Sequence, residues 1–315
     1  MALQLLVRTA TLVVTLVLAS LMVFGFMTVL PGSAARVQLG VNATEESVAQ
    51  LEAEFGLDRP LPEQYWDWVS GLPEGDFGTS YVTKATIGPQ IVDRMLVTLW
   101  LVGAGMVVAL VIAVPVGTMA AVRHRTSSGT VLTALSQVGI AIPSFLAGIL
   151  LVSVFSVWLG WFPPGGWTPP SRGLGEFLGG LALPALALGL VQGSVLSRYV
   201  RSTVLNTQRE DFMRTARSKG LLPRQAMVRH GLRNAAIPVV TVLGIQMSTL
   251  LVGAVVVEKV FVIPGLGSLL LDGVANRDLL LVQGVVMVLV VAILAVNWVV
   301  DVLYTILDPR LRAAT

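Results

Sequence analysis

The side chains that could carry out chemistry are few, and none stands in a catalytic pattern. Lys84, Lys219 and Lys259 follow Thr, Ser and Glu, so the Gly-Lys pair of a phosphate-binding P-loop is absent. His124 and His230 stand in basic stretches without the His-Glu-x-x-His pattern of a zinc protease. Cysteine is absent, which excludes disulfides and thiolate metal sites. We therefore expect no catalytic residue, no metal, no cofactor and no ATP hydrolysis by this chain.

Uncharged polar side chains occur at depth in the apolar runs, whereas acids and bases are missing from the centres of these runs. The absence of deep charges argues against proton or sodium coupling. The polar residues have two open interpretations: hydrogen bonds between helices, or the lining of a path for an uncharged or zwitterionic solute. The candidates for the path are Gln137, Gln192, Ser194, Gln246 and Ser248.

The elements that carry these residues are long apolar segments. The chain has 315 residues, of which 55% are hydrophobic and 12% charged, whereas a soluble domain carries about 25% charged residues. Charge-free runs of about 20 residues predict transmembrane helices. Pro143 is expected to break the third. We predict an all-α membrane protein with six spans, at Thr9–Leu30, Met95–Val122, Val131–Leu159, Phe177–Val200, Ala236–Val257 and Leu279–Leu307.

Positive charges gather on one side of these spans. The side that holds the N-terminus also holds the basic stretch Arg198–Arg233, while the other side holds the many acids between Glu45 and Asp93. The positive-inside rule then places both termini and the loop between the fourth and fifth spans in the cytosol. We divide the chain into the first helix with a long outer segment (1–94), a five-helix membrane domain with a cytosolic loop at about 201–235 (95–307), and a cytosolic tail (308–315).

The outer segment after the first span contains a predicted amphipathic helix. Thr44 can cap this helix, which is expected to stop at Gly56. Pro60 and Pro62 then interrupt the chain before the aromatic stretch Tyr65–Trp68. Two interpretations stay open: a cap lying at the lipid headgroups, or a docking surface for an extracytoplasmic partner that contacts Trp66 and Trp68.

The cytosolic loop predicts two helices joined by a hinge. Thr207 and Glu210 have capping-box spacing, which predicts a helix of about three turns. Gly220 is a candidate for a left-handed residue after this helix, and Pro223 for the first residue of the next. Apolar residues on one side of the first helix need cover, from the membrane surface, from the chain's own span ends or from a cytosolic motor. They are Phe212, Met213, Ala216 and the stem of Arg217.

At this loop the chain resembles the permeases of binding-protein-dependent ABC importers. Their loop carries Glu-Ala-Ala, three residues and Gly, where this chain has Thr215-Ala216-Arg217 and Gly220. The stretch Arg-Thr-Ala-Arg-x-Lys-Gly is typical of the dipeptide and oligopeptide branch. Other segments similar to that branch are Leu57–Leu61, Gly75–Ser80, Ile142–Phe145, Leu159–Pro163, Pro264–Gly267 and Leu307–Arg310.

The resemblance implies the type I ABC importer permease fold in the bacterial cytoplasmic membrane. It implies a heterodimer with a second permease, two cytosolic ATP-binding subunits and an extracytoplasmic receptor. The implied cargo is a dipeptide or oligopeptide, with nickel chelates, haem, glutathione or sugars as alternatives. The competing classes are a passive channel or secondary carrier, and a membrane-embedded structural or assembly subunit. No nucleic-acid partner is implied, and lipid surrounds the spans.

The resemblance also assigns roles to individual residues. The short loop helix becomes a coupling helix seated in a groove of the ATPase, and Gly220 becomes its pivot. The segment Pro264–Gly267 becomes receptor-facing, although a tight turn that closes the bundle is an equal alternative. The residues assigned to ATPase coupling are Phe212, Met213, Thr215, Ala216, Arg217, Lys219 and Gly220.

Overall fold

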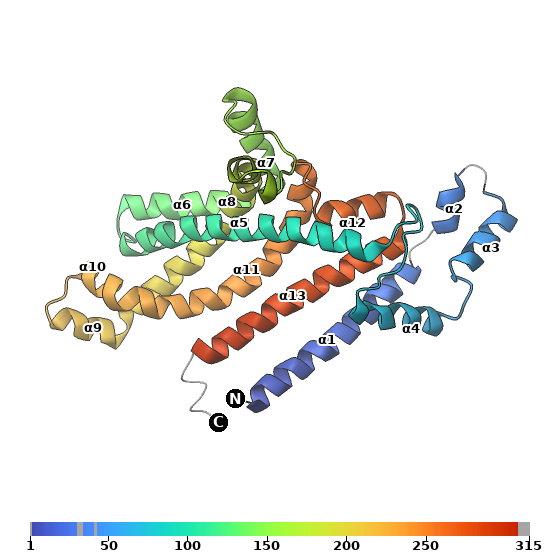
Figure 1. Ribbon diagram of the computed structural model, residues 1–315. Helices are drawn as coiled ribbons and strands as arrows, with labels where there is room; N and C mark the ends of the chain where they lie inside the picture. Colours follow the sequence, from blue (N-terminus) through green and yellow to red (C-terminus); the bar gives the residue numbers. More distant parts are fainter. Residues whose placement is uncertain (1, 30–33, 41–42, 308–315) are drawn as a thin grey trace. The chain divides into compact units, whose positions relative to one another are not determined.

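The computed structural model describes residues 2–29, 34–40 and 43–307 (Figure 1). All regular elements along these residues are helices, apart from an isolated bridge between Thr79 and Thr86. The expected cytosolic tail, 308–315, lies outside the described residues. The chain divides into two compact units, one built on Leu99–Ile263 and the other on Leu6–Thr98 together with Pro264–Ala295.

Along the part of the chain that the structure describes, five unbroken helices are long and apolar enough to cross a membrane. A sixth span results when a bent pair, α6 (Ser127–Ala141) and α7 (Ser144–Leu151) with the π-helical extension Val152–Trp158, is counted as one. The described residues therefore confirm an all-α membrane protein with six spans when this pair counts once. The five unbroken helices are α1 (Ala2–Val29), α5 (Ile87–Val122), α8 (Leu174–Arg209), α11 (Leu232–Val260) and α13 (Leu279–Leu307).

Pro143 breaks the third span, as predicted. A proline pushes the preceding residue out of the helical region, and Ile142 has φ −88° and ψ 120°. Pro143 itself is extended, with φ −61° and ψ 144°. The two halves consequently meet at 100°, which is a change of direction rather than a kink. Pro184, by contrast, lies inside the continuous helix α8 and is buried.

In the unit built on Leu99–Ile263, α8 is the central helix and packs against α6, α7 and α11. It also approaches α5 closely, because a Cβ on Gly117 would lie 2.5 Å from the carbonyl oxygen of Ser197. Ser197 Oγ donates a hydrogen bond of 2.8 Å to Ser136 Oγ of α6. Small residues that permit close backbone approach are typical of packed membrane helices. Shorter elements of this unit are a 3₁₀ turn (Pro170–Arg172), α9 (Asp211–Ser218), α10 (Pro223–Ala226) and a π-helical turn (Met227–Gly231).

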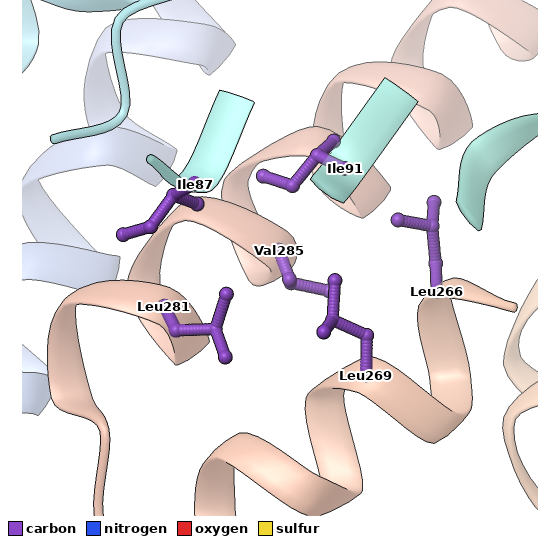
Figure 2. Close-up of a cluster of buried hydrophobic side chains, with 6 residues drawn as sticks. All are labelled: Ile87, Ile91, Leu266, Leu269, Leu281 and Val285. Carbon is purple, nitrogen blue, oxygen red and sulfur yellow. The ribbon is translucent and has the colours of Figure 1, made fainter. Parts of the chain in front are cut away.

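The second unit has a buried core where α5, α12 (Leu266–Ala275) and α13 meet, shown in Figure 2. Each helix contributes two apolar side chains, which face one another across the cluster. Helix α12 lies in a stretch that was predicted to be a loop or turn, because its ten residues are too few for a membrane span. The six core residues are Ile87, Ile91, Leu266, Leu269, Leu281 and Val285.

The segment after α1 forms short helices in the second unit: α2 (Ala34–Leu39), α3 (Glu45–Glu54), α4 (Leu61–Gly71) and a 3₁₀ turn (Leu72–Glu74). Thr44 caps α3, since its Oγ1 accepts a hydrogen bond of 3.2 Å from the Ser47 N–H. Gly56 follows α3 with φ +68°. The predicted cap and stop are therefore confirmed. Pro60 and Pro62 do not interrupt the chain but begin α4, where a missing N–H costs nothing.

Candidate functional site

The loop between α8 and α11 differs from its predicted form at its start. Helix α8 runs through Arg209, and Thr207 is buried within it instead of capping the next helix. The predicted Thr207 capping box is therefore wrong. Glu210, extended at φ −65° and ψ 148°, ends α8 and is the N-cap residue of α9. Because α8 buries Val204 and Thr207 in its own packing, it continues past the predicted cap, and α9 keeps about two turns.

Helix α9 has one face buried in the chain and one exposed. Met213 is fully buried and Ala216 is 8% exposed, because α9 packs against α8, α10 and the π-helical turn. Phe212 is 39% exposed. The chain therefore covers part of the apolar surface itself and leaves the rest open. The exposed residues among those assigned to coupling are Phe212, Thr215, Arg217, Lys219 and Gly220.

The end of α9 is a Schellman cap. Gly220 has φ +90°, its N–H donates to the Arg217 carbonyl at 2.9 Å, and the Leu221 N–H donates to the Ala216 carbonyl at 3.3 Å. The predicted left-handed glycine is confirmed. Pro223 begins α10, as predicted, and the π-helical turn that follows leads into α11. The exposed face of α9 is thus connected to a membrane-spanning helix through a fixed cap and a short helix.

The open surface of α9 is mainly cationic. Arg214, Arg217 and Lys219 are all exposed. Arg214 pairs with Asp211 at 3.4 Å, but their side chains are 75% and 94% exposed, so this ion pair contributes little to stability. Together with the half-open ring of Phe212, these side chains form an exposed cationic and aromatic surface.

Two of the five candidate path residues are buried amides with an unused donor. Gln192 of α8 is 5% exposed and Gln246 of α11 is 6% exposed. The Nε2 atom of each has no hydrogen-bond partner among the described residues. A buried polar group without a partner costs about 1–3 kcal/mol, and a water molecule or a solute could recover that cost. Both residues thus have one donor free inside the helix packing of the described residues.

The other three candidate path residues have different surroundings. Ser194 Oγ donates to the Leu190 carbonyl at 2.8 Å, within its own helix. Ser248 Oγ lies 3.4 Å from Asn297 Oδ1, which joins α11 to α13. Gln137 is exposed on α6. The two serines thus have local partners, whereas Gln137 faces the surroundings of the bundle.

The residues expected to face a receptor differ in exposure: some are open to a partner and others are buried. Trp66 of α4 is 69% exposed, whereas Trp68 is 8% exposed and packs against Val23 and Met287. The segment Pro264–Gly267 forms the start of α12, and Gly265, Leu266 and Gly267 are buried. Gly265 is the extended N-cap residue of α12, and Leu266 and Gly267 lie in the first turn of this helix. Trp66 remains the exposed aromatic residue of the candidate set.

Sequence reasoning missed Asp278, the residue that anchors the outer segment. This carboxylate is 2% exposed and accepts hydrogen bonds from Ser80 Oγ and, at 3.3 Å, from the Tyr81 N–H. The Leu281 N–H also donates to it at 3.4 Å. Burial, and then the charge of Asp278, raise the pKa of the Tyr81 phenol, while Arg59 opposes them. The signal available in the sequence was an aspartate directly before an apolar run, which is a preferred helix cap.

Comparisons with known proteins cover almost the whole chain. Residues 113–313 match the family described as "Binding-protein-dependent transport system inner membrane component". Residues 1–102 match its N-terminal companion, "Binding-prot-dependent transport system membrane comp, N-term". The two matches follow one another along the sequence, as expected for a single permease chain.

Curated relatives are similar over the full length. The "Glutathione transport system permease protein GsiC" of Salmonella choleraesuis (strain SC-B67) is 40% identical over 305 residues, 97% of each chain. The protein of the same name from Escherichia coli (strain K12) is 38% identical over 305 residues, again 97% of each chain.

Solved structures share the fold at low identity. One is an inward-facing MetNI methionine ABC transporter, with a TM-score of 0.56 and 18% identity over 69% of this chain and 96% of that chain. Another is an amino acid ABC transporter with histidines, with a TM-score of 0.51 and 17% identity over 70% of this chain and 94% of that chain. Helix content, span number and these matches agree on the type I importer permease fold. The chain belongs to the binding-protein-dependent transport system inner membrane component family, as a multi-pass permease of the dipeptide and oligopeptide type in the bacterial inner membrane.

Proposed function

We propose that this permease carries short peptides into the cell in an importer driven by ATP. The cargo class is supported by the relatives that are named glutathione transport permeases, since glutathione is itself a small peptide. It is also supported by the polar path candidates Gln192 and Gln246, whose buried amides suit a zwitterionic or hydrogen-bonding solute. Nickel chelates, haem and sugars have no comparable support in this chain.

The observation that carries the proposal is the two-faced helix α9. Its inner face, Met213 and Ala216, is held in the chain's own packing, while Phe212, Thr215 and Arg217 are exposed. A passive channel or secondary carrier needs no exposed cationic helix of this kind. We assign the exposed face, with Lys219, to the groove of an ATP-binding subunit. Gly220 fixes the exit of the chain from α9, so that movement of the ATPase is passed to α10 and α11.

The remaining partners follow from this arrangement. We propose a heterodimer with a second, related permease, two ATP-binding subunits on the cytosolic side and an extracytoplasmic receptor. Both termini and α9 would lie in the cytosol, because α9 belongs to the basic stretch Arg198–Arg233 and basic loops are retained on the cytosolic side. Trp66 is the proposed receptor contact, being the exposed ring of its helix. Alternating exposure of the path to the two sides would complete the transport cycle.

The proposal is tested by purification followed by reconstitution. Tagged protein is isolated from detergent-solubilised membranes, bound proteins are identified, and the complex is placed in vesicles with ATP on the side that the ATPases face. We expect a second permease and P-loop ATPases to co-purify, and radiolabelled glutathione or a dipeptide to accumulate when the receptor and ATP are both present. Accumulation that needs neither ATP nor a partner would overturn the proposal in favour of passive flux.

A further inference from the structure

The second unit contains a cavity to which none of the roles above has been assigned. It has a volume of about 720 Å³ and lies where the ends of α1 and α13 meet α3, α4 and the loop after α4. We call it the outer-segment cavity. Its apolar wall includes Phe24, Phe55, Trp68, Phe77 and Leu280. Small-molecule sites commonly measure about 300–1,000 Å³ and are lined by apolar and aromatic groups with a few polar ones, so the cavity has the size of a ligand site.

The aromatic part of the wall is held in place by ring contacts. Phe24 and Trp68 stack with their centroids 6.2 Å apart, and Phe55 and Tyr81 stack at 4.3 Å. The Lys84 ammonium lies over the Phe55 ring, 4.5 Å from its centre, and forms a cation–π contact with it. A wall that is fixed before binding loses little conformational freedom when a ligand enters.

The polar part of the wall carries charges of both signs. Arg59 pairs with Asp67 at 2.5 Å, and both residues line the cavity together with Arg36, Glu52 and Asp76. Among the described residues, the lining therefore contains two guanidinium groups and three carboxylates. A purely anionic ligand, such as an acidic phospholipid headgroup, would meet an excess of carboxylates. Both guanidinium groups already have carboxylate partners, Arg59 with Asp67 and Arg36 with Glu45 at 2.9 Å. A ligand with one ammonium and one carboxylate group would therefore insert among paired charges, where each of its ends meets a counter-charge.

Two buried donors in the lining have no partner. Trp68 is 8% exposed and Gln283 is 6% exposed, and both residues line the cavity. The indole Nε1 of Trp68 and the amide Nε2 of Gln283 have no hydrogen-bond acceptor among the described residues. An indole N–H in a buried site usually has an acceptor. The peptide carbonyls and the terminal carboxylate of a ligand would supply the missing ones.

We propose that the outer-segment cavity binds a short peptide with a free ammonium and a free carboxylate end. The aromatic wall takes an apolar side chain, the charged residues take the two termini, and the two unpaired donors take carbonyl or carboxylate oxygens. The inference rests on the proposed function for its choice of peptides, and it adds a holding site on the permease itself, separate from the receptor and from the polar path.

The test measures binding without the receptor. The purified permease complex in lipid nanodiscs is titrated calorimetrically with the dipeptide Ala-Phe, and separately with the same dipeptide acetylated at its N-terminus and amidated at its C-terminus. We expect the free dipeptide to bind and the capped form to bind at least tenfold more weakly. Equal binding of both forms, or no binding of the free dipeptide, would overturn the proposal. Receptor-dependent uptake is measured on the same preparation, so that loss of the cavity site is distinguished from failure of the transport assignment.

Variants place the binding in this cavity. Trp68→Phe keeps a ring against Phe24 but removes the donor, and should weaken binding about fivefold, equivalent to about 1 kcal/mol. Trp158→Phe is the matched control, because it is the same change of ring at a residue that is 81% exposed and does not line the cavity. Gln283→Leu removes an unpaired buried amide without disturbing a known hydrogen bond, so the chain should still fold while binding weakens. Unchanged binding in both Trp68→Phe and Gln283→Leu would refute the site.

Discussion

Replacement of Gly220 by valine separates the coupling role of the α9 cap from its effect on folding. Gly220 has φ +90°, and a Cβ built on it would meet nothing within 4 Å. The substitution therefore costs backbone energy alone. The left-handed conformation costs an ordinary residue about 1–2 kcal/mol, and a β-branched residue tolerates it worst. We expect the correctly capped form of α9 to lose roughly a factor of ten in population, on the basis of about 1.4 kcal/mol per tenfold change.

The assay compares transport with stability in three variants. Gly75 is a matched control, because it has φ +76° and open space around its Cβ but lies in the outer segment. Gly220→Val and Gly75→Val should lower thermal stability in detergent by similar amounts, since both carry the same backbone cost. Only Gly220→Val should uncouple ATP hydrolysis from peptide uptake. Gly220→Asn should be milder than valine, because asparagine enters the left-handed region more readily.

Two results would refute this reasoning. Normal uptake in Gly220→Val, with the loss of stability present, would show that the geometry of the α9 cap is not needed for coupling. Equal loss of uptake in Gly75→Val would show that transport responds to general destabilisation and not to the position of the glycine.

Three more substitutions test the helix packing, the contact between Asp278 and Tyr81, and the buried amide of Gln192. Gly117→Ala places a Cβ 2.5 Å from a carbonyl oxygen of α8 and should lower the melting temperature. Gly103→Ala has open space around its Cβ, so it should be neutral or stabilise the protein by about 0.5–1 kcal/mol. Equal shifts in melting temperature for the two variants would contradict the close approach of α5 to α8. Asp278→Asn should lower the raised pKa of Tyr81, measured by phenolate absorbance. Because burial favours the neutral phenol, Tyr81 contributes fully to the free energy of unfolding below about pH 10, and this contribution is lost as the pH rises through the folded pKa. An unchanged titration of Tyr81 in Asp278→Asn would contradict the contact between the two residues. Gln192→Leu should reduce peptide uptake while thermal stability holds or rises, and a fall in stability would show that the amide is already paired.

Local signals in the sequence predicted much of the fold. Long apolar runs located the spans, Thr44 located a helix cap, and Gly220 and Pro223 located the end and start of two loop helices. Each of these features depends on the backbone preference or polarity of a few adjacent residues. Pro143 likewise moves its neighbour Ile142 out of the helical conformation. The 100° angle between the two halves of the span could not be predicted from the proline alone.

Features set by distant contacts were not predictable in the same way. Thr207 has the right spacing for a cap, but α8 continues through it because that face is buried. Trp66 and Trp68 are two residues apart, yet one ring is exposed and the other packs against α1 and α13. Met213 and Phe212 are adjacent and also face different surroundings. Deciding which of two similar side chains is free for a partner requires the tertiary packing.

The most direct test of the central claim is site-specific cross-linking of α9 to an ATP-binding subunit. The chain contains no cysteine, so an introduced one is unique. Thr215→Cys places a thiol on the exposed face, and Ala216→Cys places one on the adjacent buried position, which is 8% exposed. With a thiol-reactive cross-linker in native membranes, we expect Thr215→Cys to form an adduct with an ATP-binding subunit and Ala216→Cys to form little or none. No adduct at Thr215, or equal adducts at both positions, would contradict the assignment of α9 as the coupling helix.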